Sequence, residues 1–183
     1  MNYYEETQYI AQVDEQGSIV DRIEKWKAHQ EGLLHKAFTL SLQYKEYIIL
    51  QHRKHPAFDG YYDLALSSHY LYRGDTLETD EEAALLSLER EWGLTKADLS
   101  SPITNRGFVV YKEKDPQSEF TEHEVDYLLQ TSVTSIPLPK LEYAYGVSLL
   151  TLEQLKNPAH PIQPMLAPWV KKILEANLLT LQT

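Results

Sequence analysis

Three histidines and two glutamates carry the side chains in this sequence that could bind one metal ion together. His29 and His35 lie six residues apart, His69 follows a short apolar segment, and one residue separates Glu122 from Glu124. If the glutamates belong to a β-strand, their side chains share a face, where two carboxylates repel unless a cation or a shared proton lies between them. Three imidazoles and two carboxylates suit Zn²⁺, Mn²⁺ or Fe²⁺. Spacing alone does not separate such a site from histidines that are only surface or core residues.

The composition is that of an ordinary globular protein. The chain has 183 residues, 43% hydrophobic and 24% charged, which predicts one domain over residues 1–183 with a sizeable core. Lys and Arg number 17 against 27 Asp and Glu, a formal net charge of -10. This balance argues against a nucleic-acid partner, which needs a basic face, but allows an anionic ligand held by a few placed cations. Because there is no cysteine, disulfides, thiolate metal sites and cysteine nucleophiles are excluded.

Nothing in the sequence predicts a membrane protein or a secreted protein. Residues 1–7 are polar and acidic, unlike a signal peptide, and no apolar run approaches the roughly 20 residues that span a bilayer. We therefore expect a cytoplasmic protein that acts without a membrane partner, as a monomer or as a homodimer.

Alternating and apolar segments predict the strands of a central sheet. The expected strands are residues 8–13, 18–23, 36–44, 47–51, 61–67, 108–111 and 124–131. Between them, residues 24–34 are expected to form a helical turn or loop, and residues 112–121 a polar turn.

The clearest helix is expected to begin at Asp80 as its N-cap, with Glu81 and Glu82 in the first turn. It should end before Gly93, a C′ glycine. A short helix begins at residues 151–155, and Pro168 can open a last helix over residues 169–179. Strands with few helices, not in strict alternation, predict an α/β (α+β) fold with helices packed on a mixed sheet.

Five segments, taken in order, resemble a known enzyme family. They are residues 24–29 (EKWKAH), 34–38 (LHKAF), 67–69 (SSH), 88–94 (LEREWGL) and 122–125 (EHEV). In this order and at these separations they resemble type I isopentenyl-diphosphate isomerase, a member of the Nudix superfamily, over about residues 10–170. The resemblance implies a Nudix-type mixed β-sheet sandwiched between helices.

The resemblance also implies a set of ligands. The family holds one divalent metal, which here would be Mn, Zn, Fe or Mg, with three histidines and two glutamates, and these fall on His29, His35, His69, Glu122 and Glu124. A second ion, Mg²⁺, accompanies the substrate diphosphate and is bound by the last glutamate of the Nudix helix. That position is Glu91. Family residues that grip the diphosphate fall on Lys25 and Arg53, which without the resemblance would be read as solvated charges.

The helix that carries Glu91 departs from the pattern of a Nudix hydrolase. Counted back from Gly93, the Arg-Glu pair of that pattern falls on Leu86 and Ser87, and the Glu-Glu pair on Arg90 and Glu91. Glu91 alone leaves few ligands for the metals that activate water. The helix is therefore more similar to that of the isomerase.

The proton-transfer residues also depart from the isomerase. The family places a cysteine on one face of the alkene and a glutamate assisted by a tyrosine on the other. These positions fall on Ser67, Glu124 and Tyr111. A serine hydroxyl is a much weaker acid than a thiol, whose pKa is about 8.5, so Ser67 is a poor substitute in acid–base work.

Two more family positions have changed. A basic residue of the Nudix helix that meets the diphosphate falls on Ser87. A tryptophan that stabilises the carbocation falls on Pro164, while Trp169 matches a second tryptophan expected to pack in the core. Three hypotheses follow: an isopentenyl-diphosphate isomerase of reduced activity, a Nudix hydrolase of another diphosphate, or a non-catalytic, metal-holding protein that binds a prenyl or nucleoside diphosphate.

Overall fold

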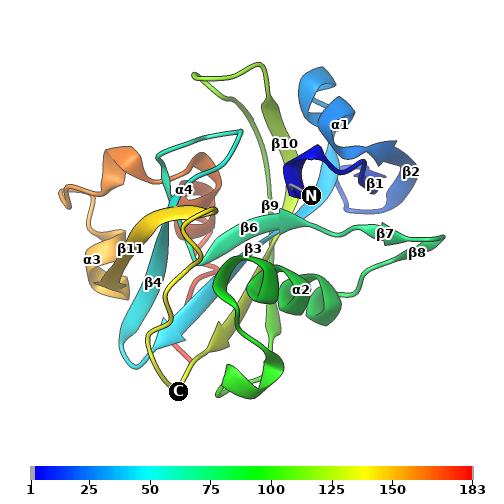
Figure 1. The fold of residues 1–183 in the computed structure, drawn as a ribbon. Helices are drawn as coiled ribbons and strands as arrows, with labels where there is room; N and C mark the ends of the chain where they lie inside the picture. Colours follow the sequence, from blue (N-terminus) through cyan, green and yellow to red (C-terminus); the bar gives the residue numbers. More distant parts are fainter. Residues whose placement is uncertain (1–2, 183) are drawn as a thin grey trace.

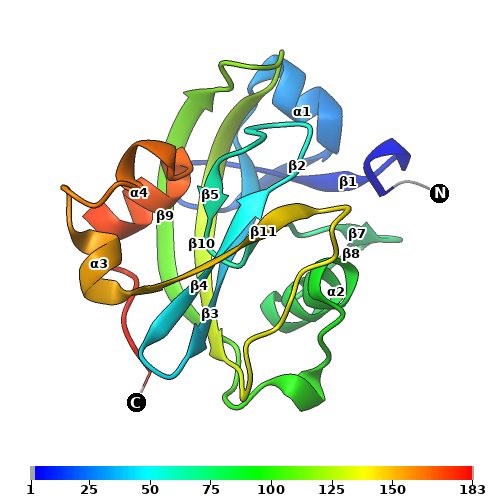
Figure 2. The same cartoon turned by 60° about the vertical axis from the view of Figure 1, so that its left-hand side comes forward.

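The computed structural model describes residues 3–182, in which helices cover both faces of a mixed β-sheet (Figures 1 and 2). The strands of the large sheet are β1 (Tyr9–Val13), β2 (Ile19–Glu24), β3 (His35–Tyr44), β4 (Tyr47–Arg53), β5 (Tyr62–Asp63), β6 (Leu66–His69), β9 (Thr104–Lys114), β10 (Thr121–Ser132) and β11 (Ala144–Thr151). A separate hairpin consists of β7 (Tyr72–Arg73) and β8 (Thr76–Leu77). The helices are α1 (Lys25–Glu31), α2 (Asp80–Trp92), α3 (Leu152–Lys156) and α4 (Pro168–Glu175). The fold class predicted from the sequence is confirmed.

β3 is the strand around which the sheet is arranged. Along one edge it pairs in parallel with β10, whose other neighbour, β9, is antiparallel to it. Along the other edge, β1, β6 and β4 pair antiparallel with β3 at its beginning, middle and end. The beginning of β3 therefore lies where β10 and β6 can both present side chains.

Two hydrophobic cores lie on the two faces of this sheet. Ile48 and Leu128 belong to the core under α3 and α4, whereas their neighbours Ile49 and Leu129 belong to the core under α2. In Figure 2, α2 and the α3–α4 pair lie on opposite sides of the strands. Because successive strand residues point to opposite faces, strands buried on both faces read as continuous apolar runs.

The start of α2 differs from the sequence prediction by one residue. The N-cap is Thr79, not Asp80. The Thr79 side chain accepts a hydrogen bond from the Glu82 backbone N–H, and the Glu82 side chain accepts one from the Thr79 N–H. This reciprocal capping box satisfies two of the free N–H groups at a helix start. The other end is as predicted: Gly93 has φ 67° and closes the helix.

Other expected boundaries also need correction. The last helix ends at Glu175, not at residue 179, because Asn177 has φ 54°, in the left-handed region. Residues 61–67 form parts of two short strands, β5 and β6, and residues 24–34 contain the helix α1. The sequence reading missed β11 and the β7–β8 hairpin. The hydrophobic pattern of β11 is weak, because most of its residues are exposed or half-exposed.

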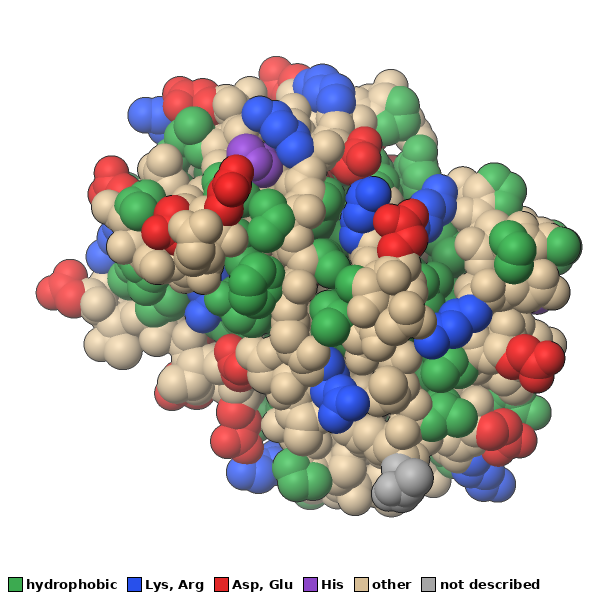
Figure 3. All heavy atoms as spheres, turned by 180° about the vertical axis from the view of Figure 1, so that it is seen from behind, with side chains coloured by type: hydrophobic (Ala, Val, Ile, Leu, Met, Phe, Trp, Pro, Cys, Tyr) green, Lys and Arg blue, Asp and Glu red, His purple; other side chains and the backbone are tan. Residues whose placement is uncertain are grey.

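Two features of the surface concern possible partners. Within residues 3–182, no helix has both the length and the apolar character needed to cross a membrane. On the face shown in Figure 3, acidic and basic side chains are interspersed.

Candidate metal centre and adjoining pocket

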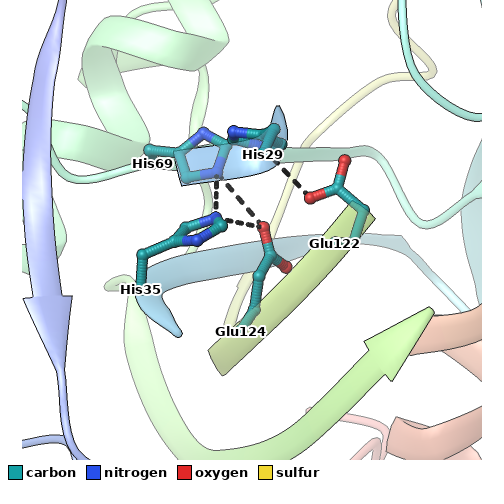
Figure 4. A group of neighbouring side chains, drawn as sticks. All are labelled: His29, His35, His69, Glu122 and Glu124. Atoms are coloured by element: carbon teal, nitrogen blue, oxygen red, sulfur yellow. Dashed lines mark hydrogen bonds and ion pairs between the residues drawn. The ribbon is translucent and has the colours of Figure 1, made fainter. Parts of the chain in front are cut away.

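Four elements bring the five histidine and glutamate side chains to one point. α1 carries His29, β3 begins with His35, β6 ends with His69, and β10 carries Glu122 and Glu124. The registers explain this, because Glu124 pairs with His35 across β10 and β3, and His69 pairs with the residue two places further along β3. One possible ligand atom from each residue lies within 4.8 Å of all the others. Figure 4 shows the side chains pointing toward a common centre.

The hydrogen bonds of two imidazoles orient their lone pairs. His29 Nδ1 lies 2.6 Å from the carbonyl oxygen of Lys25, and His35 Nδ1 lies 2.8 Å from that of Leu33. A carbonyl can only accept, so each Nδ1 carries a proton, and in the neutral ring each Nε2 has a lone pair that a metal can use. His35 Nε2 lies only 3.2 Å from His69 Nε2. Two such nitrogens repel unless a proton or a metal lies between them.

The two carboxylates meet these nitrogens from β10. Glu124 Oε1 lies 3.2 Å from His69 Nε2 and 3.4 Å from His35 Nε2. Glu122 Oε2 lies 3.2 Å from His29 Nε2, yet among the described residues this buried oxygen has no hydrogen-bond partner. A buried polar atom without a hydrogen bond is costly, so this oxygen depends on its ion pair with His29 or on a cation in the cluster.

The protonation states of the cluster also suit a cation. Burial alone would raise the pKa of Glu122, but the charge and hydrogen bond of His29 together with the charge of His69 lower that pKa on balance. Burial and the neighbouring charges of His29 and His35 hold the pKa of His69 well below 6.5. For His29, Glu122 outweighs burial and raises the pKa. Without a metal, the cluster thus gathers a proton at His29, which a metal would displace.

The chemistry of these donors fits a divalent metal. Three imidazole nitrogens and two carboxylates form a set that Zn²⁺, Mn²⁺ or Fe²⁺ accepts. All five side chains are buried or half-buried, and each has one possible ligand atom directed at the others. The group could therefore hold one metal ion.

Tyr111 and Ser67 adjoin the cluster. Tyr111 pairs with Glu124 across β9 and β10, and its hydroxyl donates to Glu124 Oε2 at 2.5 Å. Burial and the charge of Glu124 raise the pKa of Tyr111 well above 10, so the phenol keeps its proton. Ser67 lines the same pocket as Tyr111 and Glu124.

Behind the pocket, Ser67 belongs to a chain of oxygens that links two aspartates. Ser67 Oγ donates to Asp63 Oδ1 at 3.1 Å, and Thr39 Oγ1 lies 2.8 Å from Ser67 Oγ and 2.9 Å from Asp126 Oδ2. Ser67 and Thr39 thus each donate to one of the aspartates. Burial and then the charge of Glu124 raise the pKa of Asp126 well above its ordinary value.

Three cations line the pocket beside the cluster: Lys25, Arg53 and Arg90. Burial and then repulsion from Arg90 lower the pKa of Lys25 to about 7. The buried Nε atoms of Arg53 and Arg90 have no hydrogen-bond partner in the part of the chain that the structure describes. Buried guanidinium donors without acceptors indicate a place for an anion.

Glu91 lies among these cations, at the end of α2. Its Oε1 accepts from Arg90 Nη2 at 2.9 Å and its Oε2 accepts from Gln51 Nε2 at 3.2 Å. Glu91 is the one residue of α2 besides Arg90 that lines the pocket.

The structure thus brings together every site residue expected from the sequence. His35 belongs to the cluster alone. All the other expected residues line the adjoining pocket: Ser67, Glu124, Tyr111, Lys25, Arg53, His29, His69, Glu122 and Glu91.

Sequence reasoning missed Arg90. Ser87, where we expected a lost cation, lies under the Arg90 side chain, because Arg90 Nη2 donates to Ser87 Oγ at 3.1 Å and to Ser68 Oγ at 3.1 Å. A guanidinium therefore stands beside the position of Ser87 although that residue is a serine. The signal was present, since residues three apart share a helix face.

The two aromatic positions also differ from expectation. Pro164 is exposed, and it is not among the residues that line the pocket. Trp169 is buried, as expected of a packing residue, but its ring also forms a pocket wall, 4.9 Å from Arg53 Cζ and 6.0 Å from the Tyr111 ring.

The pocket is nearly filled by its own side chains. The free space between them is about 30 Å³, room for about two water molecules. Tyr3 and Tyr4 line this space, with the Tyr3 ring 4.0 Å from Arg90 Cζ and the Tyr4 carbonyl accepting from Trp26 Nε1 at 2.9 Å. A larger ligand therefore needs this segment to move.

Solved structures with a similar fold were found. A MutT protein from Methanosarcina mazei superposes with a TM-score of 0.58 at 13% identity, covering 78% of this chain and 91% of that one. A MutT NUDIX hydrolase from Burkholderia pseudomallei has a TM-score of 0.53 at 19% identity and covers 78% and 96%. At such identities these likenesses show that the fold is that of Nudix proteins.

No model of a protein family matches the chain, but curated relatives do. An isopentenyl-diphosphate Delta-isomerase from Aliivibrio fischeri is 32% identical over 130 residues, which span 67% of this chain and 68% of the relative. Isopentenyl-diphosphate delta-isomerase 2 of Homo sapiens is 29% identical and covers 91% of this chain and 80% of the relative. The chain therefore belongs to the isopentenyl-diphosphate Delta-isomerase family.

Proposed function

We propose that this chain interconverts isopentenyl and dimethylallyl diphosphate by metal-assisted proton transfer. One observation carries the proposal. A buried cluster of three histidines and two glutamates, able to hold a metal, adjoins a pocket in which Arg53 and Arg90 have buried N–H groups without partners. The metal-binding cluster suits proton transfer, and the free arginine N–H groups suit a diphosphate. The names of the relatives supply the reaction.

The diphosphate would bind among Lys25, Arg53 and Arg90. Guanidinium N–H groups match phosphate oxygens in geometry and charge, and both arginines retain a buried free donor. Glu91 lies between these cations and would bind the Mg²⁺ that accompanies a diphosphate. Because the closed pocket has only about 30 Å³ of free space, we expect Tyr3 and Tyr4 to shift when substrate enters.

The alkene would lie between Ser67 and the pair formed by Glu124 and Tyr111. Isomerisation in either direction adds a proton to one carbon and removes one from another, so the substrate gains and loses one proton in total. Tyr111 donates to Glu124 Oε2 and so orients that carboxylate. A metal bound by the five ligands would supply positive charge that polarises Glu124. The Trp169 and Tyr111 rings would present aromatic surface to a developing positive charge.

Ser67 limits this chemistry. A serine hydroxyl gives up its proton far less readily than a thiol, so we expect turnover to be slow. Hydrolysis of another diphosphate is the alternative. It is disfavoured because, of the five acidic residues on α2, only Glu91 lines the pocket.

The first prediction concerns the metal. Purified protein should contain about one Mn, Zn, Fe or Mg ion per chain by elemental analysis, because the five ligands converge. His69→Ala should lose most of it. His160→Ala, which changes a histidine outside the cluster, should keep it. Equal metal content in the two variants would contradict the ligand assignment.

The second prediction concerns the reaction. Isopentenyl diphosphate incubated in deuterated water with metal-loaded protein should yield dimethylallyl diphosphate that contains deuterium. Ser67→Cys should raise kcat by at least about tenfold, since a thiol is the better acid–base group. The same exchange at Ser41, a buried serine of β3, should leave kcat unchanged. Release of phosphate without isomerised product would favour the hydrolase, and binding without turnover would favour a non-catalytic protein.

The third prediction uses the pKa of Lys25, which is lowered to about 7. Below this pH the free protein carries an ammonium at Lys25, and above it the amine is neutral, so affinity for a diphosphate falls as pH rises. Lys25→Arg keeps its charge throughout. Calorimetry with inorganic pyrophosphate should be run from about pH 6 to pH 8.5. The Kd of the native protein divided by the Kd of Lys25→Arg should rise several-fold as the pH rises. The ionisation of pyrophosphate affects both proteins equally and cancels in this ratio. A ratio independent of pH would refute the role of Lys25.

A further inference from the structure

Asp63 is a fully buried carboxylate with four hydrogen-bond donors around it. Its Oδ2 accepts from Arg53 Nη1 at 2.6 Å. Its Oδ1 accepts from Ser67 Oγ at 3.1 Å, from the Trp169 indole at 2.8 Å and from the Leu64 backbone N–H at 2.8 Å. The carboxylate therefore joins three residues of the pocket wall that come from β4, β6 and α4.

The contact with Arg53 fixes which donor of the guanidinium stays available. Asp63 takes Nη1, and the Ala57 carbonyl accepts from Nη2 at 3.3 Å. Nε is left as a buried donor without a partner among residues 3–182. The guanidinium is thus held by its terminal nitrogens while its inner N–H stays unsatisfied.

The contact with Ser67 fixes the direction of a hydroxyl. Ser67 Oγ has one proton and donates it to Asp63, while Thr39 Oγ1 lies 2.8 Å away on another side. A serine hydroxyl otherwise rotates freely between staggered positions. Asp63 removes that freedom, because it holds the Ser67 hydroxyl from behind the pocket wall.

We propose that Asp63 is a positioning residue that holds the diphosphate-binding Arg53 and the proton-transferring Ser67 in one fixed arrangement. The inference rests on the proposed function. It goes further because Arg53 would bind the diphosphate whereas Ser67 would act on the alkene, and the one carboxylate of Asp63 couples these two residues. Trp169 is fixed by the same oxygen as Ser67, so the aromatic wall belongs to the same arrangement.

A purely structural role explains the ion pair less well. A buried Arg–Asp pair loses much hydration energy, and well-packed apolar residues of similar volume often give equal or greater stability. The pair is also incompletely satisfied, since Arg53 Nε has no partner. A charge kept in the core at this cost, with one donor left open beside a pocket, indicates a ligand for that donor.

Asp63→Asn tests the Arg53 half selectively. Three donors surround Oδ1, so the amide oxygen of asparagine should take that place and its NH₂ group should face Arg53. Ser67 and Trp169 then keep their acceptor while Arg53 loses its partner. We expect the Kd for inorganic pyrophosphate with Mg²⁺, and the KM for isopentenyl diphosphate, to rise at least about tenfold. We expect kcat to change less than about threefold. Asp63→Ala removes both contacts and should lower kcat as well.

Asp115→Asn is the matched control. Asp115 is also a buried aspartate, 2% exposed, and accepts from Phe58 N, Gln117 N and Ser118 Oγ. It does not line the pocket. A loss that came only from disturbing a buried carboxylate would appear here too, whereas we expect Kd and KM within about twofold of the native values.

Asp63→Asn leaves the buried charge of Arg53 unpaired, which can make the variant poorly stable. A double-mutant cycle on pyrophosphate binding keeps the test valid in that case, because Arg53→Gln removes this charge. In the Arg53→Gln background, Asp63→Asn should change Kd by less than about twofold. Additive losses would overturn the inference, as would identical behaviour of Asp63→Asn and Asp115→Asn. Pyrophosphate binding needs no turnover. Coupling between Asp63 and Arg53 without isomerisation would therefore refute the proposed reaction while leaving the role of Asp63 toward Arg53 supported.

Discussion

The rest of the site depends on a charge and lone-pair constraint at the beginning of β3. Imidazole nitrogens of His35 and His69 face each other at 3.2 Å, and two glutamates on β10 point at the same small volume. Such an arrangement is repulsive unless protons or a cation lie between these groups. The backbone enforces it, because the parallel pairing of β10 with β3 and the antiparallel pairing of β6 fix the three strands relative to one another. A metal ion would convert this repulsion into stabilisation, and the fold can then be seen as its scaffold.

The pocket next to this centre divides into two halves. One half has cations, with Arg53 and Arg90 each keeping a buried donor that has no partner among residues 3–182. The other half has Ser67, Tyr111 and the Trp169 ring. Asp63 contacts both halves, through Arg53 in one and through Ser67 and Trp169 in the other. Arg90 places a guanidinium beside Ser87, whereas the sequence has no cysteine that could stand near Ser67.

The sequence was sufficient for the cluster itself. The same-face placement of Glu122 and Glu124 follows from strand alternation, and the ordered family segments selected His29, His35 and His69 from seven histidines. The fold class also followed from the order of elements. The N-cap of α2 was wrong by one residue because Asp80 and Thr79 are both capable caps, and only the contact between Thr79 and Glu82 distinguishes them.

The contacts of Asp63 could not have been predicted from local patterns. They join β5 to a residue ten positions earlier and to the indole of α4 more than one hundred positions later. Arg90 could have been found from its spacing to Ser87, but its orientation depends on Ser68 and Tyr3 as well. Long-range polar contacts of this kind depend on the packing of elements, which neither propensity nor periodicity encodes.

In the proposed metal centre, three imidazoles and two carboxylates bind one metal ion at the beginning of β3. X-ray absorption spectroscopy at the edge of the bound Mn, Fe or Zn measures the first coordination shell directly. We expect a shell of nitrogen and oxygen atoms at about 2.0–2.2 Å, with the multiple-scattering pattern of about three imidazole rings. A shell of oxygen atoms without imidazole scattering would show that the ion is bound elsewhere, and would rule out this metal centre.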